Sequence, residues 1–163
     1  MGLVTRKDVT QSDSDRLAAL LIEHDVAALV EKHSPQNLRI GFDIEWLQEN
    51  ALAASFPRIN TAGPYNITLS PLLLEWGLTD GIAFPTIILH ELGHVIDRVR
   101  NWNRYASMEC LHHEDLEYVA DDFVVACGWK VKLIETLRRS VALGPKAEDG
   151  MAGKRLARLL KAE

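Results

Sequence analysis

An apolar run in the middle of the chain is the feature that most constrains the fold. Residues 82–89, Ile-Ala-Phe-Pro-Thr-Ile-Ile-Leu, lead directly into His90, and the apolar pattern continues to Val99. Its length and spacing predict a helix, and apolar residues on nearly every side predict that the helix is buried. Pro85 fits such a helix only in the first turn, where a backbone N–H would have no helical partner in any case.

A pentapeptide with three ionisable residues lies within this predicted buried helix. Residues 90–94 read His-Glu-Leu-Gly-His. Helix positions four residues apart lie on one face, about 6 Å apart at Cβ, so the rings of His90 and His94 can bind one metal ion. Glu91, rotated by about 100°, can then reach a water on that metal and act as general base and general acid. The alternative is a core helix with two hydrogen-bonded histidines, but burying these polar groups without partners is costly.

A second motif can supply what two histidines lack. A catalytic zinc site normally has three protein ligands and one open position. Residues 117–121, Glu-Tyr-Val-Ala-Asp, place Glu117 and Asp121 one turn apart on the same face of a predicted helix. We expect Glu117 to be the third ligand and Asp121 to orient His90 through a hydrogen bond. His113, one turn before Glu117, is a rival ligand because it shares that face.

Together the two motifs resemble those of the gluzincin metallopeptidases, and most closely the M48-like branch with its HExxH and ExxAD signatures. Residues 50–51 and 67–73 are similar to that family's rim strand and to the segment before its zinc helix. The resemblance implies an α+β, zincin-like domain with a small β-sheet, a zinc helix and a C-terminal helical half. It also implies a Zn2+-dependent endopeptidase of the minimal soluble type, whose extended peptide or protein substrate pairs with a rim strand at residues 65–69.

A regulatory or assembly protein is the alternative interpretation of the same motifs. The ImmA/IrrE-type proteins also carry HExxH and a downstream acidic helix, so a resemblance to them implies a zinc site with narrow or no proteolytic activity. In such a protein the metal site cleaves one dedicated partner or only stabilises the fold. Bound zinc without turnover of any peptide would favour this alternative.

The rest of the pattern predicts one domain over residues 1–163, with its core at about residues 15–143. Residues 44–54 fit a helix as an alternative to a strand, and residues 144–163 fit either a tail or a short basic helix. Turn-forming residues between the last two predicted strands favour an antiparallel connection. The predicted helices cover residues 12–33, 82–99, 107–128, 129–143 and 154–161, the predicted strands residues 38–42, 51–56 and 65–69, and a predicted loop residues 101–104.

Charge and composition exclude several classes of partner. The chain has 18 Lys and Arg against 23 Asp and Glu, a net charge of -5, so no excess positive charge attracts nucleic acid. No segment supplies the about 20 apolar residues needed to cross a bilayer. Residues 1–14 lack an apolar signal region, and the two cysteines, Cys110 and Cys127, fit reduced thiols. We therefore expect a cytoplasmic protein with no nucleic-acid or membrane partner; the pattern does not indicate an oligomeric state.

Overall fold

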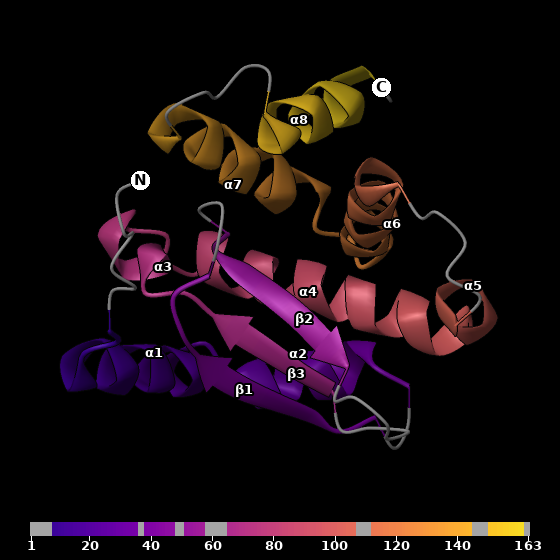
Figure 1. Cartoon of the computed structure of the whole chain (residues 1–163). Helices are drawn as coiled ribbons and strands as arrows, with labels where there is room; N and C mark the ends of the chain where they lie inside the picture. Colours follow the sequence, from indigo (N-terminus) through magenta and orange to yellow (C-terminus); the bar gives the residue numbers. More distant parts are fainter. Residues whose placement is uncertain are drawn as a thin grey trace, which may run out of the picture.

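A small mixed sheet and a central helix, α4 (Ala83–Arg100), organise the α+β fold in the computed structural model (Figure 1). The structure describes residues 8–35, 38–47, 51–57, 65–106, 112–144 and 150–161. The other helices in these ranges are α1 (Gln11–Glu23), α2 (Val26–His33), α3 (Leu72–Glu75), α5 (Trp102–Ala106), α6 (His113–Ala126), α7 (Lys130–Leu143) and α8 (Met151–Lys161).

The sheet contains β1 (Ile40–Ile44), β2 (Ala53–Pro57) and β3 (Tyr65–Leu69) in the order β1-β3-β2. β1 pairs in parallel with β3, and β2 pairs antiparallel with β3, which confirms the predicted connection between the last two strands. The alternative of a helix through β2 is wrong. The predicted rim strand is also wrong, because β3 is the central strand and both of its edges are already paired.

Helix α4 lies between two hydrophobic clusters, and this explains its burial. One cluster joins Phe84 and Ile88 to α1, α2 and β3, and the other joins Leu92 and Ile96 to α6, α7 and α8. Pro85 occupies the first turn of α4, as predicted. Just before this turn, the carboxylate of Asp80 accepts hydrogen bonds from the backbone N–H groups of Ile82 and Ala83, which satisfies donors that a helix start leaves free.

Two local predictions fail for backbone reasons. The single opening helix is divided into α1 and α2, because Asp25 adopts the left-handed conformation with φ 45°. The predicted loop after α4 contains a short helix, α5. The next helix, α6, begins at His113, and the earlier part of its predicted range, residues 107–111, lies outside the described residues.

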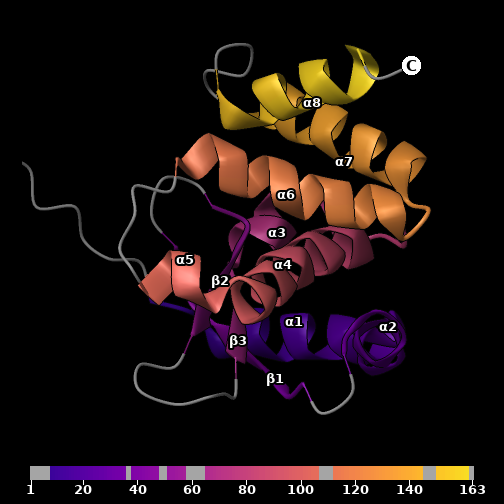
Figure 2. The ribbon, with the colours of Figure 1, turned by 90° about the vertical axis from the view of Figure 1, so that its right-hand side faces the viewer.

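The C-terminal half forms a stack of helices on the side of α4 away from α1 and α2. Figure 2 shows α6, α7 and α8 following one another outward from α4. Helix α7 was predicted, and it ends at Gly144. Residues 151–161 form the helix α8 rather than a tail, and its Leu159 is buried in the second cluster. None of the helices described is both long and apolar enough to span a bilayer.

Candidate metal centre

Close packing of α4 against α6 brings the two sequence motifs together. A Cβ atom on Gly93 would lie 3.0 Å from Cα of Ala120 and 3.1 Å from its carbonyl oxygen, so only glycine permits this approach without a shift. Ala120 lies between Glu117 and Asp121 on α6. The contact therefore carries both carboxylates to the face of α4 that holds the histidines. In the HExxH pattern Gly93 occupies one of the two positions at which the motif specifies no residue type, so the motif does not indicate this role.

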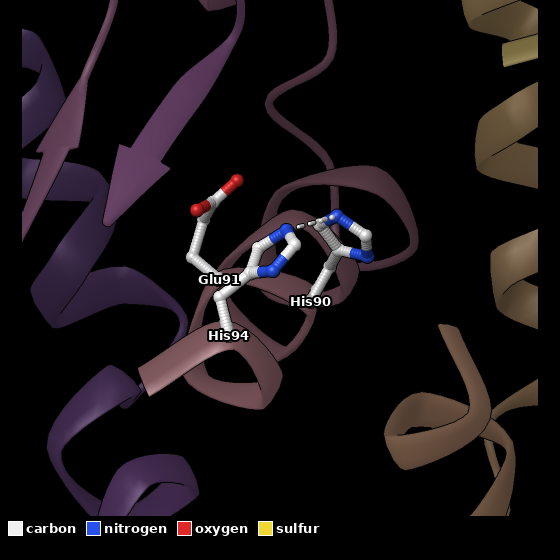
Figure 3. Close-up of side chains that lie close together, drawn as sticks. All are labelled: His90, Glu91 and His94. Atoms are coloured by element: carbon white, nitrogen blue, oxygen red, sulfur yellow. Dashed lines mark hydrogen bonds between the residues drawn. The ribbon is translucent and has the colours of Figure 1, made fainter. Parts of the chain in front are cut away.

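The side chains of His90, His94 and Glu117 converge on one point. The Nε2 atoms of the two histidines lie 3.2 Å apart, and their rings meet nearly edge to face. Figure 3 shows the rings turned toward each other, with the Glu91 carboxylate extending beside them. One oxygen of Glu117 lies 3.2 Å from Nε2 of His90, and its other oxygen lies 3.2 Å from Nε2 of His94. Each of these three side chains thus directs a potential metal-binding atom toward the other two.

These spacings fit a tetrahedral metal ion. Zinc binds imidazole nitrogen and carboxylate oxygen at about 2.0–2.2 Å, and ligands of a tetrahedron with such bonds are roughly 3.3 Å apart. The 3.2 Å separations agree with that value. Glu91 also offers an oxygen within 4.8 Å of both histidine nitrogens. We take Glu117 as the better third ligand, because its oxygens are closer to both rings.

Asp121 contacts the ring nitrogen of His90 that does not face Glu117. Its Oδ1 lies 3.0 Å from Nδ1 of His90, and its side chain is fully buried. Burial alone would raise the pKa of Asp121, but hydrogen bonds from His90 and Arg155 lower it below its usual value, so the carboxylate is ionised. A proton on Nδ1 that is donated to Asp121 leaves the Nε2 lone pair free for a metal.

Glu117 is held as a carboxylate in the same way. Burial would raise its pKa, but hydrogen bonds from His90 and His94 and the nearby charge of Arg155 lower it far below the usual value. The hydrogen bond from His90 to Glu117 requires a proton on Nε2. When His90 is instead neutral and donates through Nδ1 to Asp121, its Nε2 lone pair and a Glu117 oxygen are two acceptors 3.2 Å apart. Two facing acceptors repel, and a proton or a metal cation between them removes that repulsion.

Arg155 also belongs to the candidate site, although its position in the sequence does not indicate this. It projects from α8, and its guanidinium contacts Asp121 and Glu117. Its Nη2 also lies 3.0 Å from Nδ1 of His90. The sequence predicts only a tail or a short basic helix here, and several basic residues in one short helix do not single out one arginine.

A cavity of about 870 Å³ adjoins the candidate metal centre and is lined in part by His90, His94 and Glu117. Glu91 lines it, as do residues of β2, and the wall formed by α7 contributes the apolar side chains Leu133, Leu137 and Val141. His113 also lines the cavity but is exposed to solvent. Among the described residues, Glu117 and not His113 makes the 3.2 Å contacts with both histidine rings.

The arrangement can bind a divalent cation with two imidazoles and one carboxylate, and it keeps a second carboxylate, Glu91, beside an accessible cavity. The chain matches no protein-family model, no curated protein and no solved structure, so a function for it rests on its residues and on the geometry of this centre.

Proposed function

We propose that the chain is a zinc-dependent endopeptidase in which His90, His94 and Glu117 bind the metal. The observation that carries the proposal is the convergence of three side chains. The two Nε2 atoms lie 3.2 Å apart and each lies 3.2 Å from one of the two Glu117 oxygens, which is close to the ligand spacing of a tetrahedral zinc site. Asp121 behind His90 adds the carboxylate–histidine pair that commonly accompanies such ligands. The likeness of both motifs to those of gluzincins agrees with this assignment.

Glu91 is the proposed general base and general acid. Bound zinc supplies Lewis-acid chemistry, which polarises a scissile carbonyl and makes a water more acidic. The Glu91 carboxylate takes a proton from the attacking water and delivers it to the amine that leaves when the C–N bond breaks. Glu91 is 7% exposed and lines the cavity, so it is shielded from bulk water yet accessible to a substrate.

An extended peptide fits the cavity best along β2. This strand pairs with β3 on one side, and within the described residues no strand occupies its other side. Ala53, Ala54 and Ser55 of β2 line the same cavity as the metal ligands. A substrate that adds to this edge by main-chain hydrogen bonds would lie beside Glu91. The proposed substrates are therefore protein or peptide segments in extended conformation.

Substitution of Glu91 tests the proposal. Glu91→Gln should keep zinc near one ion per chain, while cleavage of an unfolded protein substrate falls by about 100-fold or more. Glu31→Gln, at an exposed site on α2, is the matched control and should keep full activity.

Other outcomes separate the rival interpretations. Equal cleavage by Glu91→Gln and the parent would exclude Glu91 as the base. Zinc bound by a parent protein that cleaves no peptide would favour the regulatory or assembly role. A parent protein that binds no zinc would contradict the metal centre itself.

A further inference from the structure

Helix α8 contributes one side chain that reaches the candidate metal centre. The guanidinium of Arg155 donates from Nε to Oδ2 of Asp121 at 2.9 Å and from Nη2 to Oδ1 at 2.6 Å. Its Nη1 donates to Oε2 of Glu117 at 3.0 Å. Arg155 therefore bridges a proposed metal ligand and the carboxylate that orients another ligand.

Burial makes this bridge different from an ordinary surface ion pair. The Arg155 side chain is 14% exposed, and Asp121 is fully buried. A buried carboxylate without a charge partner is costly, and a bidentate guanidinium fixes its direction as well as its charge. The guanidinium also places its positive charge beside both Glu117 and Asp121, and this charge helps to lower the pKa of each carboxyl group.

The neighbouring basic residues of α8 provide an internal comparison. Lys154 pairs with Glu114 at 2.8 Å, and Arg158 pairs with Asp122 at 2.6 Å, so they too join α8 to α6. Both pairs are exposed: the Arg158 and Asp122 side chains are 34% and 59% accessible. Exposed pairs of this kind contribute little. Of these basic residues, only Arg155 reaches the side chains at the metal centre.

Arg155 also affects which ring nitrogen of His90 carries the proton. Its Nη2 and the Asp121 Oδ1 both lie 3.0 Å from Nδ1 of His90. Arginine is only a donor, so a hydrogen bond from Arg155 to Nδ1 would require the proton of neutral His90 on Nε2, the nitrogen that must bind metal. Nη2 of Arg155 donates to Oδ1 of Asp121 at only 2.6 Å. The guanidinium therefore holds this oxygen beside Nδ1 of His90, where it can accept the Nδ1 proton.

We propose that Arg155 is a positioning residue of the metal centre, which fixes Asp121 and Glu117 in the orientation that metal binding requires. The inference rests on the proposed function, since it assumes that His90, His94 and Glu117 bind zinc. It makes α8 a structural part of the site, so that helices α4, α6 and α8 assemble the centre together.

The sign of the effect on zinc affinity tests this role. Removing a cation near a cation site should tighten zinc binding if charge repulsion is its main effect. Loss of positioning should weaken zinc binding, by roughly 10- to 100-fold as for other residues that orient ligands. Arg155→Ala is the first variant, and zinc affinity is measured by competition with a chromophoric chelator. Arg155→Lys keeps the charge without the bidentate geometry and should not restore affinity. If Arg155→Ala does not fold, the zinc affinity of Arg155→Lys tests the positioning role in its place.

Arg158→Ala is the matched control, since it removes an arginine from the same helix, and it should bind zinc as the parent does. At saturating Co2+, the visible spectrum should change in Arg155→Ala and not in Arg158→Ala, because it reports coordination geometry and not global stability. Unchanged or tighter zinc binding by Arg155→Ala would overturn the role, as would full affinity in Arg155→Lys. Equal weakening in Arg158→Ala would assign the effect to docking of α8. A parent that binds no zinc would instead refute the metal centre, and the inference with it.

Discussion

At the scale of single residues, Glu117 and His113 are the two candidates for the third ligand of the proposed zinc site, because they lie one turn apart on α6. The geometry favours Glu117, because one of its oxygens lies 3.2 Å from Nε2 of His90 and the other lies 3.2 Å from Nε2 of His94. We expect Glu117→Ala to weaken zinc binding by more than the roughly 10- to 100-fold expected for Asp121→Ala, which removes only an orienting partner. His113→Ala should change zinc affinity little, since this side chain is exposed.

Competition titration of the variants with zinc measures all of these effects on one scale. Far-UV circular dichroism of each metal-free variant checks that the fold is retained. If His113→Ala loses more affinity than Glu117→Ala, the ligand assignment is reversed and the likeness to gluzincins weakens with it.

The residues of the candidate site differ in how far their sequence positions predict them. His90 and His94 could be paired from sequence, as could Glu117 and Asp121, because a spacing of four residues places side chains on one helix face. The spacing of residues within a helix does not indicate which helices pack against each other. Arg155 lies far along the chain from Asp121, and its neighbours Lys154 and Arg158 have the same chemistry, so only the packing of α8 distinguishes it.

At the scale of helices, the separation of α4 and α6 depends on Gly93. A methyl group at this position would meet backbone atoms of Ala120 at 3.0 and 3.1 Å, so α6 would have to move by a few tenths of an ångström. Overpacking of this kind costs about 1–3 kcal/mol, which is at least as large as the about 1 kcal/mol that alanine gains over glycine within a helix. We therefore expect Gly93→Ala to lower the free energy of unfolding and to weaken zinc binding, because Glu117 moves with α6.

Urea unfolding and zinc titration measure the two effects separately. Gly81→Ala is the control, since a Cβ atom at Gly81 meets nothing within 4 Å. A Gly93→Ala protein as stable as the parent, with the same zinc affinity, would show that close helix packing does not set the geometry of the centre.

Some elements could be predicted because local pattern determines them, and others depend on tertiary pairing. The apolar run of α4 and the Gly144 end of α7 are local signals, and both predictions are confirmed. The break between α1 and α2 depends on a left-handed Asp25, a conformation that few non-glycine residues adopt. Alternation along β3 predicted a strand but not its place at the centre of the sheet, because strand order is set by contacts between distant segments.

At the scale of the whole molecule, the candidate metal centre lies where the two halves of the fold meet. Helix α4 belongs to both hydrophobic clusters and carries His90 and His94, while Glu117 comes from the C-terminal helical stack. Glu117 lies on a different helix from the two histidines, so the three proposed ligands meet only in the folded state. If zinc binds as proposed, its binding is coupled to folding, and we expect zinc to stabilise the native state by mass action.

The coupling predicts a large change in thermal stability on removal of zinc. At a free zinc concentration 100 times the dissociation constant, binding adds about 2.7 kcal/mol to the free energy of unfolding. For a chain of 163 residues this corresponds to a melting temperature about 5–10 °C higher with zinc than after chelation. Scanning calorimetry with measured zinc content tests this. His90→Ala should show no such difference between its two states, because it lacks a ligand. An unchanged melting temperature in the parent after verified metal removal would mean that the centre does not join the two halves through zinc.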